Sequence, residues 1–100
     1  MAQRGGKGPV TVSFEATLWR YPGKGGWHFA PVPAALAPTW TRGWGRTPVV
    51  ATVDGHTWQT SVWRGKNGRV ELAVPRHVRG AKGDGDVVAV RLTYARSDDD

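Results

Sequence analysis

The stretch PVVATVDGHTWQTSVWR, residues 48–64, consists of two segments in which apolar and polar residues alternate, joined by Asp54 and Gly55. Alternation with a period of two is typical of a half-buried β-strand, because successive side chains point to opposite faces of the sheet. An Asp-Gly pair suits a two-residue turn, since glycine accepts the positive φ that a type I′ turn requires. The stretch therefore predicts a β-hairpin in which residues 48–53 pair with residues 57–64.

Segments with a similar pattern lie on both sides of this hairpin and are separated by turns that contain glycine or proline. They cover residues 10–20, 27–32, 69–74 and 87–95. Short strands separated by such turns are typical of sandwiches and barrels. The sequence therefore predicts an all-β fold.

The two halves of the chain resemble each other. FEATLWR, residues 14–20, matches WQTSVWR, residues 58–64, with an identical Trp-Arg ending and similar side-chain character at the other positions. A turn with glycine and lysine follows each segment, YPGKGG in the first half and GKNG in the second. These matches predict an internal duplication, with accidental similarity among β-rich segments as the alternative.

The match continues beyond these turns. From Gly26 and from Gly68, a strand of equal length leads to a proline, Pro33 or Pro75. Proline suits the first helical position because its φ is already set and it has no N–H to leave unpaired, so each proline is expected to open a short helix. Each half then closes with a strand that begins Val-Val-Ala. The predicted unit is strand, turn, strand, short helix, strand, used twice.

A three-stranded unit of this size cannot bury its apolar face alone, whereas two units related by a pseudo-twofold axis can close a barrel. We therefore predict a small closed double-split β-barrel of six or seven strands with two short helices. The single domain covers residues 9–96, with repeat one at about 10–53 and repeat two at about 57–95. A disordered basic tail, residues 1–8, and an acidic tail, residues 97–100, are expected to flank a monomeric domain.

The charge and the cysteine content limit the classes of protein to which this chain can belong. Residues 9–96 carry 12 basic and five acidic side chains, a net charge of +7 against +6 for the whole chain. Such an excess favours an anionic partner, although solubility alone is an alternative role. With no cysteine, a disulfide scaffold and thiolate chemistry are excluded. No apolar run reaches the length of a membrane span, so a soluble cytoplasmic protein without a membrane partner is expected.

The strand at residues 27–32 can place either of its faces inward. One orientation buries His28 with Ala30 and Val32, and the opposite one buries Trp27 and Phe29. The second removes more apolar area from water and leaves no lone imidazole in the core. We therefore expect Trp27 and Phe29 to face inward.

No residue pattern points to catalysis, to a metal or to a cofactor. The three histidines have no metal-ligand spacing, and no second acid lies two residues from either mid-strand glutamate. Asp54, Asp84 and Asp86 lie in predicted turns, where short acidic side chains bond to nearby backbone. The glycine-rich turns do not lead into a helix, as a phosphate loop would. No catalytic or metal-binding residue is therefore predicted.

Residues 68–92, GRVELAVPRHVRGAKGDGDVVAVRL, are similar to the swapped-hairpin unit of the AbrB and MazE family. The shared order is a strand, Val-Pro, a short arginine-bearing helix, a Gly-Asp turn and a valine-rich strand. In AbrB relatives, dimeric barrels present arginines to DNA. The resemblance therefore implies nucleic-acid binding, although here only one half is basic.

Nearly the full length resembles a small bacterial family of domains of unknown function, whose members stand alone or precede a YdeI/OmpD-associated domain. The segments that carry the resemblance are FEATLW, GGWHFAPVP, GRTPVVATVDGHTWQTSV and NGRVELAVPRHVRGAKGDGDVV. It implies a single-chain double-split β-barrel, as if the two protomers of an AbrB-type dimer had been fused. It implies no activity, and a link to envelope or antimicrobial-peptide stress comes from genomic context only.

The loop PTWTRGWGRTP, residues 38–48, is the first candidate site. The step from proline to the third strand is 16 residues in this half and 12 in the other, so the loop exceeds what the repeat requires. Indole rings beside guanidinium groups suit a small anionic or aromatic ligand. The predicted ligand-binding residues are Trp40, Arg42, Trp44 and Arg46. The alternative role of the loop is a lid that plugs one end of the barrel.

The second candidate site is a basic cluster of Arg76, Arg79 and Lys82 around the second short helix, where the corresponding PAALAP of the first half has no charge. Such a cluster can neutralise phosphates, so these residues are the predicted nucleic-acid-binding set. The alternative for Arg79 is to tie the helix to the barrel through the Gly-Asp turn. Overall we expect a binding module for a small anionic or aromatic ligand rather than an enzyme, with nucleic-acid binding or a protein-interaction adaptor in envelope or antimicrobial stress as alternatives.

Overall fold

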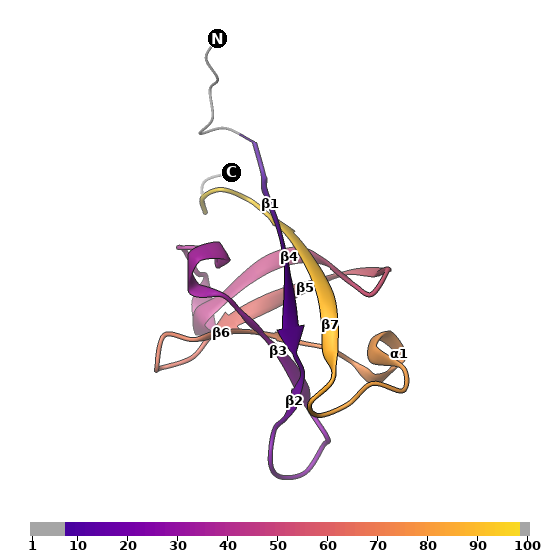
Figure 1. The fold of residues 1–100 in the computed structure, drawn as a ribbon. Coiled ribbons are helices and arrows are strands. Elements are labelled where there is room, and N and C mark those ends of the chain that lie inside the picture. Colours follow the sequence, from indigo (N-terminus) through magenta and orange to yellow (C-terminus); the bar gives the residue numbers. More distant parts are fainter. Residues whose placement is uncertain (1–7, 99–100) are drawn as a thin grey trace.

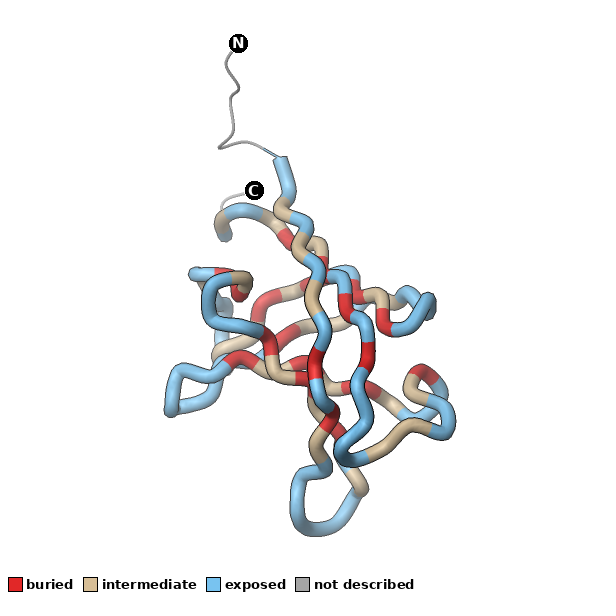
Figure 2. Tube along the Cα trace, viewed as in Figure 1, coloured by how far each residue is buried: buried red, intermediate tan, exposed pale blue. Residues whose placement is uncertain are grey.

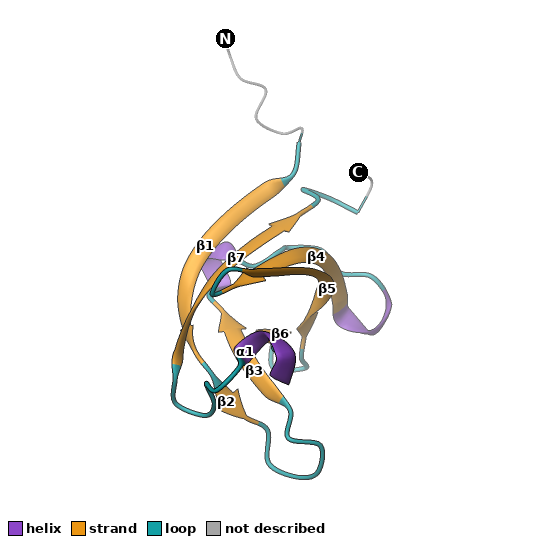
Figure 3. Ribbon diagram, turned by 90° about the vertical axis from the view of Figure 1, so that its right-hand side faces the viewer, coloured by secondary structure: helices purple, strands orange, loops and turns teal. Residues whose placement is uncertain are grey.

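A single sheet of seven strands forms the fold, in the order β1-β7-β4-β5-β6-β3-β2, in the computed structural model, which describes residues 8–98. The strands are β1 (Val10–Thr17), β2 (Trp19–Arg20), β3 (His28–Val32), β4 (Arg46–Val53), β5 (His56–Arg64), β6 (Val70–Ala73) and β7 (Val87–Tyr94). Every pairing between them is antiparallel. The sheet curls into a half-barrel (Figures 1 and 3), which confirms the predicted all-β class.

The central hairpin forms as predicted. Strands β4 and β5 pair from Arg46 opposite Trp63 to Val53 opposite His56, with Asp54 and Gly55 between them. Both turn residues have positive φ, 47° and 89°, as a type I′ turn requires. The hairpin prediction from the Asp-Gly pair is confirmed.

The predicted strand at residues 10–20 is divided at Leu18 into β1 and β2. Strand β1 pairs with β7, whereas β2 pairs with β3 at the other end of the strand order. Leu18 itself donates its N–H to the Asp86 carbonyl and accepts from the Gly85 N–H, both at 2.8 Å. One short segment therefore contributes to both edges of the sheet.

The core lies on the inner face of the curled sheet, where every second residue of β3, β4, β6 and β7 is buried. Figure 2 shows this alternation along the strands. The most deeply buried aliphatic side chains are Leu18, Ala30, Ala51, Val53, Val62, Leu72, Val88 and Leu92. Burial of this kind stabilises the fold by about 25 cal/mol per Å² of apolar surface removed from water.

The predicted orientation of the 27–32 strand is wrong. His28, Ala30 and Val32 are buried, whereas Phe29 is only partly buried and Trp27 is 58% exposed. Phe29 packs against other rings on the outer face, including Trp27 at 6.4 Å between centroids. The imidazole of His28 bonds to backbone, which removes the penalty that the prediction assigned to it.

Two short helical turns follow Pro33 and Pro75, as predicted. They are the 3₁₀ turn η1 (Ala34–Leu36) and α1 (Arg76–Arg79). Each proline is the N-cap residue, with an extended ψ of 137° or 160°, so each helix begins one residue later than predicted. A third helical turn, η2 (Gly43–Gly45), lies in the 38–48 loop and was not predicted.

The predicted tails fall largely outside the described residues. This applies to residues 1–7 of the N-terminal tail and to residues 99–100 of the acidic tail. Asp98 is described, and its carboxylate pairs with the Arg42 guanidinium at 2.9 Å. Within residues 8–98, no helix is long and apolar enough to cross a membrane.

Candidate functional site

A pocket of about 470 Å³ lies between the β2–β3 connection and α1. It brings together two segments that are about 50 residues apart in the sequence. Its lining residues are Arg20, Gly25, Gly26, Trp27, His28, Val74, Pro75, Arg76 and Arg79. Three of these nine residues are arginines, and none is a carboxylate.

The sheet register positions the first of these arginines. Arg20 lies opposite His28 across β2 and β3. Its backbone N–H donates to Asp84 Oδ1 at 2.9 Å, which ties the end of β2 to the turn before β7. The Val74 N–H donates to the His28 carbonyl at 2.9 Å and so brings the start of α1 to the same place. Backbone bonds therefore hold both walls of the pocket.

His28 forms the buried wall of the pocket. Its Nδ1 lies 2.7 Å from the Gly26 carbonyl. A carbonyl oxygen can only accept, so Nδ1 carries the proton in this bond and a neutral ring would leave Nε2 as an acceptor. His28 is thus a satisfied structural residue with one free ring nitrogen beside Gly83.

Arg79 leaves one polar group without a partner. Its Nη1 donates to the Lys82 carbonyl at 3.2 Å, within the turn that follows α1. Its Nε is buried and has no hydrogen-bond partner among the described residues. A buried donor without an acceptor costs about 1–3 kcal/mol, and the cost is larger for charged groups. The Nε–H of this guanidinium can therefore still donate a bond to an anionic group placed beside it.

The sequence-predicted basic cluster is brought together only in part. Arg76 and Arg79 line the same pocket, but Lys82 does not. The Lys82 ammonium is 2.8 Å from Asp54 Oδ2 and 2.7 Å from the Val87 carbonyl, so it fastens the hairpin turn to the start of β7. The Arg79 bond to Lys82 also agrees with the alternative of a link between the helix and the Gly-Asp turn.

The four predicted ligand-binding residues of the 38–48 loop lie in two different places. Trp40 and Arg42 line a groove of about 400 Å³ over β4 and β7, where the Arg42 guanidinium lies 5.6 Å from the centre of the Trp40 ring. Trp40 Nε1 donates to the Ala95 carbonyl at 2.9 Å, and Arg42 pairs with Asp98. These contacts fix the Trp40 ring against the end of β7.

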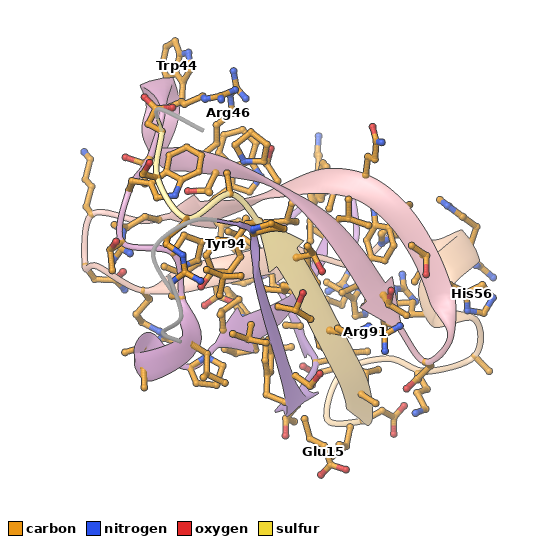
Figure 4. The ribbon with its side chains drawn as sticks, turned by 90° about the horizontal axis from the view of Figure 1, so that it is seen from above. Glu15, Trp44, Arg46, His56, Arg91 and Tyr94 are labelled. Atoms are coloured by element: carbon orange, nitrogen blue, oxygen red, sulfur yellow. The ribbon has the colours of Figure 1, made fainter. Side chains whose placement is uncertain are left out.

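Trp44 and Arg46 do not line this groove. Trp44 is 91% exposed and has a φ of 68°, in the region that favours glycine. Arg46 opens β4 and lies opposite Trp63. Figure 4 shows both side chains at one end of the molecule, with Tyr94 closer to its centre. The exposed indole of Trp44 does not plug an end of the sheet.

Sequence reasoning missed Arg20, Trp27 and His28 as partners of Arg76 and Arg79. The signal that could have found them is the repeat itself. In both halves a Trp-Arg pair precedes a glycine-lysine turn, and in the first half this turn leads into Trp27 and His28. The pairing of residues 20 and 28 then follows from the hairpin register.

No geometry for metal binding is present among residues 8–98, where no group of three or more histidine, aspartate or glutamate side chains gathers. Each of the three turn aspartates accepts a bond from a backbone N–H, but only Asp86 bonds to backbone nearby in the sequence, as predicted. Asp54 accepts from Ala89, Asp84 from Arg20 and Asp86 from Gly83. His56 and His77 are exposed, and His56 lies at the hairpin turn (Figure 4). The chemistry available in the pocket is therefore charge-assisted hydrogen bonding by guanidinium groups.

Comparison with known families agrees with the resemblance seen in the sequence. Residues 14–92 match the family described as "Domain of unknown function (DUF1905)". No curated protein matches the chain. Since the match covers well over half of the chain, the protein belongs to the DUF1905 family.

Proposed function

We propose that this DUF1905 protein is a binding module whose ligand is a small anion, held by Arg20, Arg76 and Arg79 in the pocket between the β2–β3 connection and α1. One observation carries the proposal: the pocket has three arginines and no carboxylate among its lining residues, and the Nε of Arg79 has no acceptor within the described part of the chain. Guanidinium groups match carboxylate and phosphate oxygens in geometry as well as in charge. An anion in this pocket supplies the missing acceptor.

Trp27 gives the proposed site an aromatic edge. It lines the pocket and is 58% exposed, so its indole is accessible beside the arginines. A ligand that combines an anionic group with a flat ring would therefore gain both guanidinium bonds and ring contact. Trp27 also supplies a fluorescence signal for binding.

The proposal is tested by titrating the protein with inorganic phosphate, pyrophosphate, citrate and a nucleoside monophosphate. Calorimetry and tryptophan fluorescence monitor the binding. We expect at least one of these anions to bind, and Arg76→Ala to weaken binding about tenfold, which corresponds to the loss of about 1.4 kcal/mol. At tenfold excess over Kd the anion should raise the free energy of unfolding by about 1.4 kcal/mol and the melting temperature by several degrees.

Arg91→Ala is the matched control, because Arg91 lies on the outer face of β7 and does not line the pocket. It should bind the anion as the unchanged protein does. Arg79→Lys keeps the charge but removes Nε and should also weaken binding. Equal affinities for the Arg76, Arg79 and Arg91 variants, or no heat and no thermal shift with any anion, would disprove the proposed site.

The groove lined by Trp40 and Arg42 is a second candidate for the ligand site. Its volume of about 400 Å³ and the guanidinium beside the Trp40 ring favour an anionic or aromatic ligand. The bond from Arg42 to Asp98 competes with an anion at this position. If Arg42→Ala rather than Arg76→Ala abolishes binding, the ligand lies in this groove.

We also infer that the fold is a duplicated barrel and that it acts as a monomer; the strand pairings support the duplication. In the sequence match Trp19 corresponds to Trp63 and Phe29 to Glu71, and the pairs Trp19–Phe29 and Trp63–Glu71 are both opposite each other in the sheet. The corresponding strands β3 and β6 pair with each other, as do β4 and β7. A pseudo-twofold axis between the halves would produce these equivalences.

Closure of the barrel is supported by the segment at residues 10–20. Its two parts, β1 and β2, occupy the two ends of the strand order and are separated only by Leu18. A chain that continues from one edge of the sheet to the other joins the two edges covalently. Closure by this route would remove most of the exposed strand edge.

A further inference from the structure

The outer face of β2, β3, β6 and β5 carries aromatic side chains, of which only Trp27 also lines the anion site. We call this the aromatic face: Trp19, Tyr21, Trp27, Phe29 and Trp63. Tyr21 is 52% exposed, Trp27 58% and Trp63 43%, while Trp19 and Phe29 are partly buried. Large exposed rings that gather on one face mark interaction surfaces more often than rings scattered singly.

Four rings of this face, all except Trp63, form a continuous series. Trp19 lies 5.3 Å from Phe29 and 6.1 Å from Tyr21 between ring centroids. Phe29 in turn lies 6.3 Å from Tyr21 and 6.4 Å from Trp27, with the Trp27 and Phe29 planes only 13° apart. The rings therefore support one another and are held in place before any partner binds.

A groove of about 320 Å³ connects these rings to Trp63. It is lined by Trp19, Tyr21, Phe29, Trp63, Arg64, Gly65, Asn67, Arg69 and Glu71. Its single carboxylate is occupied, since Glu71 accepts a bond from Trp19 Nε1 at 3.0 Å and pairs with Arg69 at 3.5 Å. Glu71 thus orients the Trp19 ring and leaves the groove without an unpaired negative charge.

Cationic residues lie at both ends of the aromatic face. The β3–β6 register places the β5–β6 turn near Val32 and the β2–β3 turn near Ala73, so the two turns lie at opposite ends of these strands (Figure 1). Lys66 lies in the first turn and Lys24 in the second. Both are exposed, and neither forms an ion pair among the described residues. The Arg69 side chain is 62% exposed beside the groove.

We propose that the aromatic face binds a single strand of nucleic acid, whose bases stack on Trp63, Tyr21 and Trp27 while its phosphates contact Lys24, Lys66 and Arg69. Base faces need flat, exposed rings, and the backbone needs positive charge along the same track, which is the combination found here. A second copy of the chain fits less well, because each copy carries a net charge of +6. Because the contacts are to bases and phosphates, DNA and RNA strands should bind alike.

The test is fluorescence anisotropy with labelled oligothymidylate and oligouridylate of about ten nucleotides. Trp63→Ala and Tyr21→Ala should each weaken binding about tenfold, as expected for the loss of one stacking ring. Affinity should fall with rising salt, and Arg69→Gln should lower the slope of log Kd against log salt concentration by about 0.7, the value for one phosphate contact with a single strand. A duplex of the same length should compete poorly, since its bases are already stacked.

Trp44→Ala is the matched aromatic control, because Trp44 is exposed but lies outside the aromatic face. It should bind the strand as the unchanged protein does. Arg76→Ala separates this proposal from the anion site: Arg76 does not line the groove, so strand binding should persist even where binding of pyrophosphate is lost. Circular dichroism confirms that each variant is folded.

Three outcomes would overturn the proposal. The first is an affinity for the single strand no higher than for the duplex. The second is equal weakening by Trp63→Ala and Trp44→Ala. The third is self-association of the protein that Trp63→Ala abolishes, since this would assign the aromatic face to a second copy of the chain.

Discussion

At the scale of single residues, Asp54 connects three parts of the fold. Its Oδ1 accepts from the Ala89 N–H at 2.9 Å, and its Oδ2 accepts from the Lys82 ammonium at 2.8 Å. The bond from the Ala89 backbone, followed by that from Lys82, holds the pKa of the Asp54 carboxyl below its ordinary value of 3.8. Asp54, whose positive φ suits the turn, therefore also fastens the hairpin to β7.

We predict that Asp54→Asn lowers the free energy of unfolding by about 1 kcal/mol at neutral pH, because it removes the charge from two hydrogen bonds at a partly exposed site. The folded pKa is lowered, so the contribution of the carboxylate is complete above the unfolded pKa and is lost as pH falls through the folded pKa. Urea unfolding of the unchanged protein and of the variant, at pH 7 and near pH 3, measures the difference in their free energies of unfolding at each pH. A difference between the two proteins that grows toward acid would contradict this assignment.

At the scale of elements, the approach of the 38–48 loop to β5 depends on Gly45. Its φ is 72°, and a Cβ at this position would lie 2.7 Å from the Arg64 carbonyl oxygen. Arg64 in turn holds the loop, since its Nη2 donates to the Pro38 carbonyl at 2.7 Å. The loop and the end of β5 therefore form one packed unit.

Gly45→Ala should lower the free energy of unfolding by about 2 kcal/mol, from the left-handed backbone and the backbone clash together. The neighbouring Gly43 is the control, because a Cβ there meets no atom within 4 Å and its φ is not positive. Thermal unfolding of the two variants measures the difference. Equal stability of Gly43→Ala and Gly45→Ala would show that the loop does not approach β5 in this way.

Also at the scale of elements, the sequence predicts the strands well and their orientation less well. The hairpin follows from Asp54 and Gly55 alone, because a type I′ turn depends on two adjacent residues. The orientation of β3 does not follow in this way. Burying Trp27 and Phe29 is the better choice for an isolated strand. Instead Phe29 packs on the outer face against Trp19 and Tyr21, and Trp27 stacks on Phe29. Contacts with another segment of the chain therefore decide which face of β3 is buried.

The candidate site, like the strands, could be predicted from the sequence only in part. The clustering of Arg76 and Arg79 is visible in the sequence, since they lie on one helical turn. Their association with Arg20 and His28 is not, because it depends on the register of β2 with β3 and on the bond from Val74 to the His28 carbonyl. The roles of Lys82 and Arg42 also depend on distant partners, Asp54 and Asp98.

At the scale of the whole molecule, a curled sheet presents two different surfaces for binding. The pocket between the β2–β3 connection and α1 has three arginines and suits a compact anion, whereas the outer face of the same strands has aromatic rings and suits an extended strand. Trp27 lies at the junction, since it lines the pocket and stacks on Phe29. Variants at Arg76 and at Trp63 separate the two surfaces.

The most direct test of the anion site is the nuclear magnetic resonance signal of the Arg79 Nε–Hε group, assigned by its disappearance in Arg79→Lys. The Nε of Arg79 is buried and has no acceptor in residues 8–98, so a bound anion should change this signal more than that of any surface arginine. During titration with pyrophosphate, we predict a saturating shift of the Arg79 signal with the same Kd as the Trp27 indole signal, while Arg91 does not move. An Arg79 signal that stays in place while exposed arginines drift in proportion to salt would contradict the account.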